Sequence, residues 1–170
     1  MQGKLQQSYR VAREIERNAA FEGEIAMAQL PRLRELLRED AHPQPLKLRF
    51  EFRRTEWGAR SIRGHIEAQL PMTCERCLGA MDLPVEQDFE LLIDAREGDD
   101  EAGLEVIHSD EGWIDLFALV EEEVMLALPI IRRHDNVDCN EFWRPSDPEE
   151  TMEAERDNPF AALAALKGKL

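Results

Sequence analysis

The clearest local structure in the sequence is the stretch LKLRFEFRRTEWGARSIRGHIEAQL at residues 46–70. Apolar and polar residues alternate in two runs, 46–53 and 62–70, and a turn that contains Gly58 joins them. Alternation with a period of two is typical of strands with one buried face, and a connection that contains glycine favours an antiparallel hairpin. Residues 46–70 are therefore predicted to form a hairpin that turns its apolar face toward the core.

The polar face of this hairpin, together with its turn, carries the best basic patch in the sequence. We predict a nucleic-acid-binding surface at six residues: Lys47, Arg49, Arg53, Arg54, Arg60 and Arg63. Arginine binds phosphate with two parallel hydrogen bonds and stacks on bases, so clustered arginines are typical of such surfaces. Glu51 and Glu67 on the same face favour the alternative, which is an ordinary solvent-exposed sheet surface.

The hairpin leads into Cys74-Glu75-Arg76-Cys77-Leu78-Gly79, which a further strand-like run follows. Two thiols separated by two residues bind one metal ion from a tight turn or form a disulfide. A structural zinc site usually has four ligands, and His134 and Cys139 are the other candidates that lie close together in the sequence. The sequence thus predicts zinc as a cofactor, bound by Cys74, Cys77, His134 and Cys139.

Two alternatives for the cysteines stay open. The thiols are partly buried at a strand end, or the CxxC turn belongs to a zinc- or thiol-dependent enzyme or redox sensor. A reactive CxxC usually lies at a helix N-terminus, whereas strand-like residues flank this one. The sequence contains no G-x-S-x-G, no HExxH and no glycine-rich phosphate loop, so we expect no catalytic residues and no enzyme.

Apolar residues at helical spacing predict the elements that pack on the hairpin. Residues 114–128 form the strongest pattern, a long and largely buried helix that ends at Pro129. At least one of the three glutamates at 121–123 is expected to face solvent or to pair with an arginine, because a lone buried carboxylate is costly. Shorter helices are predicted over residues 4–18 and from Leu30-Pro31 onward. The predicted fold class is α+β, with a small antiparallel β-sheet or partial barrel packed against a long apolar helix, peripheral helices and an extended C-terminal tail.

Residues 1–143 are predicted to form a single α+β domain, and residues 144–170 an acidic linker with a short C-terminal helix. The helix begins at Asn158-Pro159, where a capping residue precedes a proline. Its apolar stripe consists of Phe160, Leu163 and Leu166. A helix this short is marginal in water without a surface to pack on, so the stripe is predicted to dock on this protein or on a partner.

Charge is unevenly distributed over the 170 residues, whose net charge is −15. Residues 1–80 carry 14 Lys+Arg against 11 Asp+Glu, and residues 81–170 carry 7 against 25. This asymmetry favours a protein that touches nucleic acid on one face only, or an acidic half that keeps the protein soluble. We expect no membrane span and no secretory signal, and three cysteines fit a reducing cytoplasm.

Three stretches of the sequence occur in the same order as in the members of a known protein family. They are Cys74-Glu75-Arg76-Cys77-Leu78, the run from Ile114-Asp115-Leu116 through Glu121-Glu122-Glu123-Val124 to Ala127-Leu128-Pro129-Ile130, and the ending Asn158-Pro159-Phe160-Ala161-Ala162-Leu163. In order and spacing they resemble the YceD family, the large ribosomal RNA subunit accumulation proteins. The resemblance implies a role in the synthesis, processing or stability of large-subunit (23S) ribosomal RNA, without an established catalytic activity. Some members have a second cysteine pair after the long helix, where this chain has His134 and Cys139.

The resulting hypothesis is a cytoplasmic ribosome-assembly factor that acts by binding rather than by catalysis. Its expected partner is large-subunit ribosomal RNA, bound by the hairpin arginines, or a basic ribosomal protein, bound by the acidic half. A small acidic adaptor that docks its C-terminal helix on a partner is a further alternative. We expect no DNA partner.

Overall fold

The computed structural model describes residues 5–95 and 103–140. The chain divides into two units, Met1–Asp135 and Asn136–Leu170, and the described part of the second contains one short 3-10 helix, η2 (Val137–Cys139). The predicted acidic linker and the stripe of Phe160, Leu163 and Leu166 lie outside the described residues.

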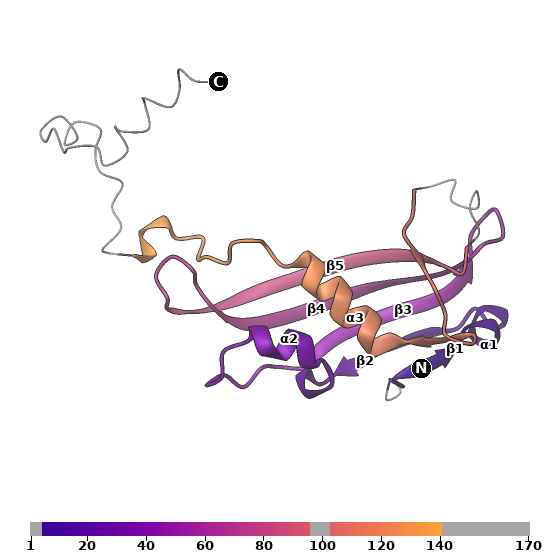
Figure 1. Ribbon diagram of the computed structural model, residues 1–170, viewed down its shortest axis with the longest axis horizontal. Helices are drawn as coiled ribbons and strands as arrows, with labels where there is room; N and C mark the ends of the chain where they lie inside the picture. The colour runs from indigo at the N-terminus through magenta and orange to yellow at the C-terminus, as the bar shows by residue number, and fades with distance from the viewer. Residues whose placement is uncertain (1–4, 96–102, 141–170) are drawn as a thin grey trace, which may run out of the picture. The chain divides into compact units, whose positions relative to one another are not determined.

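The first unit is α+β, and its main sheet has five strands in the order β2-β3-β4-β5-β6 (Figure 1). The strands are β2 (Ala20–Ile25), β3 (Leu46–Arg54), β4 (Arg60–Thr73), β5 (Ala80–Ile93) and β6 (Val106–Ile107). β3 and β4 form the predicted hairpin, with Lys47 opposite Glu67 and Arg54 opposite Arg60. The sheet is mixed rather than wholly antiparallel, because β6 pairs with β5 in parallel.

One face of this sheet forms the core and the other carries polar residues. Leu46, Leu48, Phe50 and Phe52 are at most 3% exposed, whereas the residues between them are exposed or half-buried. The helix α3 (Leu116–Ala127) crosses the core face, with α2 (Pro31–Leu36) next to it and the 3-10 helix η1 (Met27–Gln29) before α2 (Figure 1). In the described part of the chain, no helix is long and apolar enough to cross a membrane.

Helix α3 is shorter than the predicted range 114–128. Asp115 caps its start, because the Asp115 carboxylate accepts a hydrogen bond from the Ala118 amide at 3.0 Å. Leu128 is extended, as residues before a proline usually are. The residues just before the helix form a short strand, β7 (Trp113–Asp115).

The predicted helix over residues 4–18 is wrong in its first half. Ser8–Arg10 form the strand β1, which pairs with β7, and only Val11–Glu16 are helical, as α1. The strand gains backbone hydrogen bonds from β7 that an isolated helical turn cannot offer. It also places the Tyr9 ring 4.8 Å from the ring of Phe21 and 5.4 Å from that of Phe50. Tertiary packing therefore decides this segment.

The three glutamates of α3 have different environments. Glu122 is exposed, which confirms that one of them faces solvent. Glu121 is 5% exposed, and its carboxylate accepts a hydrogen bond from the amide of Leu33 in the first turn of α2, at 3.0 Å. Glu123 is also buried, at 8% exposure. One carboxylate of α3 thus caps α2, which has no side-chain cap of its own.

Gly64 in the middle of β4 lets an aromatic ring cross the strand. A Cβ atom at this position would lie 2.5 Å from the Cζ atom of Phe89 and 2.7 Å from the carbonyl oxygen of Arg49. Neither distance leaves room for a methyl group, so glycine is required for the packing of Phe89 between its neighbours.

Candidate metal centre and charged sheet face

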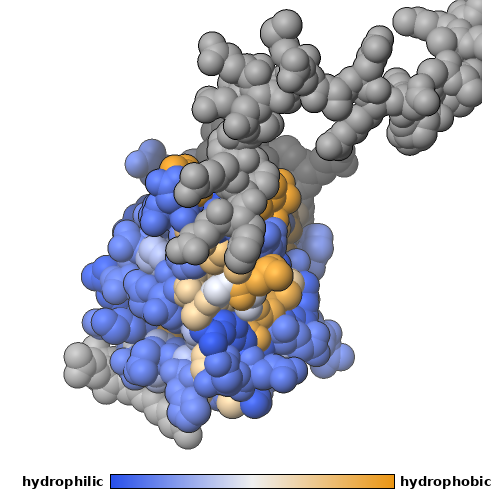
Figure 2. All heavy atoms as spheres, turned by 90° about the vertical axis from the view of Figure 1, so that its left-hand side faces the viewer, coloured by the Kyte–Doolittle hydropathy of each residue, from blue (hydrophilic) through white to orange (hydrophobic). Residues whose placement is uncertain are grey.

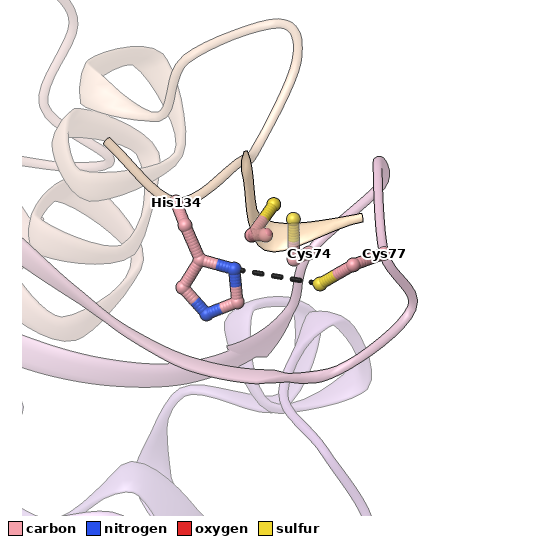
Figure 3. Close-up of side chains that lie close together, drawn as sticks. Cys74, Cys77 and His134 are labelled. Carbon is pink, nitrogen blue, oxygen red and sulfur yellow. Dashed lines mark hydrogen bonds between the residues drawn. The ribbon is translucent and has the colours of Figure 1, made fainter. Parts of the chain in front are cut away.

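The CxxC turn connects β4 to β5, as the sequence predicts. Its ends are held together by the Cys74 amide, which donates to the Gly79 carbonyl at 2.9 Å, and by the Leu78 amide, which donates to the Cys74 carbonyl at 2.8 Å. Leu78 has a left-handed backbone, with φ of 59°, and its side chain is 78% exposed. The turn thus brings both thiols to the same side of a tight loop (Figure 3).

His134 reaches this turn from the segment that follows α3. Its Nδ1 lies 3.5 Å from the Sγ of Cys77, and its Nε2 lies 2.9 Å from the carbonyl oxygen of Ala80 (Figure 3). A carbonyl oxygen only accepts hydrogen bonds, so Nε2 carries the ring proton and Nδ1 keeps its lone pair. A histidine fixed in this way by a backbone carbonyl is typical of metal ligands.

Contacts between main chain and side chains hold the two segments together beside the cluster. The Glu75 amide donates to the Arg132 carbonyl at 2.7 Å. The Arg132 guanidinium in turn donates two hydrogen bonds to Glu75 Oε1, at 2.8 and 2.9 Å. These contacts hold the segment that carries His134 against the CxxC turn.

Cys74 lies in the best environment for a thiolate. Its side chain is 0% exposed, and burial raises the pKa of its thiol. Hydrogen bonds to the sulfur from the backbone amides of Cys77, His134 and Arg76, and from the Cys77 side chain, outweigh burial and lower the pKa from 9.0 to about 6. A metal ligand must be the thiolate, so these amides favour metal binding.

The candidate ligand atoms of Cys74, Cys77 and His134 lie within 4.8 Å of one another. Two thiols and an imidazole at this spacing form a cluster that can bind a metal ion, and tetrahedral zinc is the ion that such donors usually bind. Cys139, the fourth predicted ligand, ends η2 in the second unit and follows His134 by five residues in the chain. Its role as a ligand stays a prediction.

Exposed apolar residues lie next to this cluster in the chain. Leu78 belongs to the CxxC turn, and Ile130 and Ile131 directly precede Arg132, with exposed fractions of 98% and 58%. Figure 2 views the end of the molecule that lies on the left in Figure 1, and it shows apolar atoms gathered there among charged ones. The surface near the cluster is therefore mixed in character.

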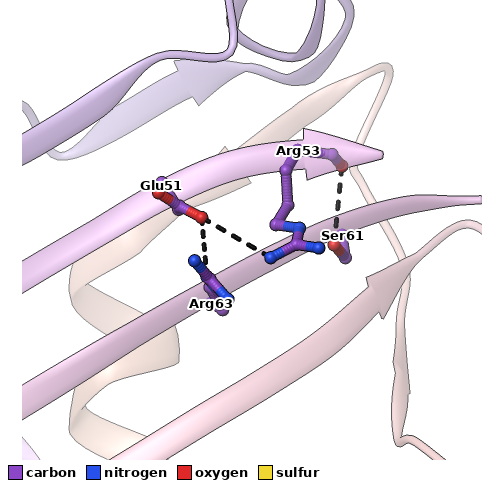
Figure 4. Close-up of polar contacts among 4 residues, drawn as sticks. All are labelled: Glu51, Arg53, Ser61 and Arg63. Atoms are coloured by element: carbon purple, nitrogen blue, oxygen red, sulfur yellow. Dashed lines mark hydrogen bonds and ion pairs between the residues drawn. The ribbon is translucent and has the colours of Figure 1, made fainter. Parts of the chain in front are cut away.

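The six predicted RNA-binding residues lie on β3, β4 and their turn, and most have partners within the protein. Arg63 lies 2.6 Å and Arg53 3.8 Å from the same carboxylate oxygen of Glu51 (Figure 4). Arg60 pairs with Asp94 at 3.0 Å, and Arg54 donates to the Gly58 carbonyl at 2.9 Å. The two others, Lys47 and Arg49, are exposed.

The neighbouring strands add acidic residues to this face. We consider residues 47–53 of β3 and the residues aligned with them on β2, β4 and β5. Over this part of the sheet, the polar face carries four lysine and arginine side chains and seven carboxylates. The carboxylates belong to Glu22, Glu24, Glu51, Glu67, Glu86, Asp88 and Glu90. His65 lies in the middle, with its Nδ1 2.7 Å from Asp88 and its Nε2 3.5 Å from Glu67. A hollow of about 630 Å³ lies here, and its lining includes Arg49, His65 and Asp88. The hairpin alone has a basic face, but the complete sheet has an acidic one.

The sequence matches a known protein family over most of its length. The family model of the large ribosomal RNA subunit accumulation protein YceD matches residues 62–167. The chain belongs to the YceD family. A relative from Haemophilus influenzae, named Large ribosomal RNA subunit accumulation protein YceD, is 33% identical over 116 residues, which are 64% of this chain. The match spans 66% of that relative's length, and no solved structure matches the chain.

Proposed function

We propose that this chain supports the accumulation of large-subunit ribosomal RNA, and that it does so by binding rather than by catalysis. Membership of the YceD family carries the proposal, because the match at residues 62–167 includes most of β4, the CxxC turn, β5 and α3. The relative is named for the same role. Ribosome assembly would place the chain in the cytoplasm, where thiols remain reduced.

We assign zinc a structural role in this function. Both ring nitrogens of His134 are engaged, and Cys74 is buried, which is typical of a closed site rather than of one with an open position for a substrate. Cys139 would supply the fourth ligand, since five extended residues span up to about 17 Å. Bound zinc would fasten the segment after α3 to the CxxC turn.

The proposed partner on the polar sheet face is a basic protein of the assembling subunit. Seven carboxylates against four cations repel a phosphate backbone and attract lysine and arginine side chains. Direct RNA contact is the second candidate, and the hairpin turn favours it. Arg54 is exposed there, and Trp57 is 40% exposed, so the tip offers a cation and a ring for stacking.

The test measures the ratio of large- to small-subunit ribosomal RNA in cells that lack this chain. The same ratio is measured in these cells when a plasmid supplies the chain. We expect the ratio to fall and the wild-type chain to restore it. An unchanged ratio would overturn the proposed function. If a Cys77→Ser chain restores the ratio while binding no zinc, zinc is not required for the proposed function.

Direct RNA contact is tested by a salt series with purified chain and large-subunit ribosomal RNA. The variant Arg54→Ala/Trp57→Ala removes the exposed cation and ring, and Arg63→Ala, whose guanidinium already pairs with Glu51, is the matched control. Binding that weakens steeply with salt and is lost in the first variant alone would support RNA contact. Equal binding by all three chains would exclude the hairpin tip.

Titration of the thiols with and without a chelator distinguishes a structural zinc site from the alternative, a thiol enzyme or redox sensor. A structural site predicts thiols that react only after zinc is removed. Fast reaction of one thiol in the untreated chain would favour the alternative instead.

A further inference from the structure

A second cavity, lined by carboxylates and apolar side chains, lies on the other side of the sheet from the polar face discussed above. It has a volume of about 370 Å³, and α3, β5 and the segment 105–115 form its walls. Among the described residues that line it there are five carboxylates and neither a lysine nor an arginine. They belong to Glu105, Asp110, Asp115, Glu122 and Glu123. This lining is more uniformly acidic than the sheet face.

The lining also contains His108, but none of the five carboxylates forms an ion pair within the described residues. Asp115 is used by the fold, since it caps α3 and accepts a hydrogen bond from the Gln7 side chain at 2.9 Å. Within the described ranges, Glu105, Glu122 and Glu123 form no ion pair. The cavity therefore holds negative charge that the described residues do not neutralise.

Glu123 is the informative member, because its side chain is 8% exposed. Burial, the nearby Glu105 and the neighbouring Glu122 raise the pKa of its carboxyl, and a hydrogen bond from Gln87 only partly opposes them. A buried carboxylate is costly unless it is paired. A cation bound in the cavity would pair with the Glu123 carboxylate and so reduce the cost of its burial.

The remaining walls are apolar and identify the kind of cation. Leu91, Ile107 and Leu119 line the cavity, and its edge carries Trp113 and Leu126, which are 44% and 68% exposed. An aliphatic chain that ends in a cation fits such a cavity, because its stem covers apolar surface while its head meets carboxylates. An arginine already uses this chemistry within the chain, since the Arg10 guanidinium lies over the Trp113 ring at 5.8 Å.

We propose that this cavity binds a lysine or arginine side chain of a basic protein segment, with apolar neighbours in that segment covering Trp113 and Leu126. The exposed ring and leucine favour a protein over a free polyamine, because a polyamine has no apolar side chain to cover them. The carboxylates disfavour RNA at this site. The inference deepens the proposed function, on which it rests for the identity of the partner as a protein of the assembling subunit.

The test uses the full chain, ¹⁵N-labelled, and an acetylated and amidated probe peptide of sequence Gly-Leu-Arg-Leu-Gly. The control peptide has citrulline in place of arginine, and citrulline keeps the shape of the arginine side chain but has no charge. Spermidine is a third ligand. Chemical-shift changes measure the dissociation constants, and the Trp113 indole signal, assigned with Trp113→Phe, reports on the cavity.

The variant Glu105→Gln/Glu122→Gln removes two exposed carboxylates of the cavity, so the fold should persist, as an unchanged unfolding temperature would verify. Glu35→Gln/Glu39→Gln changes two exposed carboxylates that belong to neither acidic surface, and it is the control with the same change of charge. We expect the citrulline peptide and the cavity variant each to weaken binding at least tenfold, and the control to stay within twofold. Leu126→Ser should weaken binding about fivefold or more, because it removes apolar contact at the edge.

Four results would overturn the proposal: no shift of the Trp113 signal with the arginine peptide, equal affinity for the citrulline peptide, equal loss in the control variant, or tighter binding of spermidine than of the peptide. A shift of the Trp113 signal by a large-subunit RNA fragment in the absence of peptide would also overturn it. None of these results depends on the RNA ratio in cells. Failure of the cavity and failure of the proposed function can therefore be distinguished.

Discussion

Replacing Glu121 by alanine should release α2 from α3. The Glu121 carboxylate accepts a hydrogen bond from the Leu33 amide at 3.0 Å, and its side chain is 5% exposed. This amide belongs to the first turn of α2, where no intrahelical partner exists and Leu30 offers no side-chain cap. A hydrogen bond to a charged acceptor contributes about 1.5–3 kcal/mol, and a buried amide left alone loses that contribution in full. We therefore expect Glu121→Ala to lower the free energy of unfolding by about 2–3 kcal/mol.

Two further variants separate the cap from other effects of the substitution. Glu121→Gln keeps an acceptor and removes the charge, so it should lose only the interaction with the helix dipole, about 0.5–1 kcal/mol. Glu122→Ala changes the exposed neighbour and should stay within about 0.5 kcal/mol of the wild type. Urea unfolding at pH 7, followed by circular dichroism, should shift its midpoint by about 1 M for Glu121→Ala. Equal losses for the alanine variants at 121 and 122 would refute the cap.

Three other results are expected. Gly64→Ala should lower the free energy of unfolding by about 1–3 kcal/mol in thermal unfolding, because its Cβ would lie 2.5 Å from the Phe89 ring; an unchanged melting temperature would contradict this packing. The purified chain should contain one zinc ion per molecule by metal analysis, and Cys77→Ser should contain none; retention of the metal by that variant would remove Cys77 from the site. The pKa of Glu123 is higher in the folded chain than in the unfolded chain. The free energy of unfolding therefore falls as the pH rises from the pKa of the unfolded state through that of the folded state, because the ionised carboxylate is less favourable in the fold. Glu123→Gln should therefore stabilise the chain at pH 7 and have little effect below pH 4, and an equal effect at both values would show that the charge is not responsible.

The sequence predicts the elements whose pattern is local. Alternation at residues 46–70 is enough for the hairpin, because the burial of Leu48 and Phe50 requires nothing beyond one sheet face. The position of the CxxC turn between two strands follows from the same pattern. His134 is also found as a neighbour of Cys77, since ligand chemistry and the scarcity of histidine leave few other candidates.

Features that depend on pairing between distant segments escape such patterns. Tyr9 has helical spacing to Leu5 and Ala12, yet it lies in a strand because Ile114 faces it across β1 and β7. The acidic character of the sheet face depends on which strands flank the hairpin, since β2 and β5 place Glu22 and Asp88 next to basic residues. The cavity at Glu123 likewise exists only because the segment 105–115 lies along α3 and β5. A signal was available in the run of three glutamates within an apolar helix, which is hard to explain by solvent exposure alone.

An acidic chain can support RNA accumulation through the proteins that bind RNA. A net charge of −15 opposes long-range attraction to phosphate, and it steers basic proteins toward the chain. Lysines and arginines of a basic protein neutralise RNA phosphates without regard to sequence, and the same side chains would enter the cavity. A partner held there would have part of its charge neutralised until RNA, with its higher charge density, displaces it. The proposed partner and the proposed function are therefore compatible even though neither acidic face favours RNA.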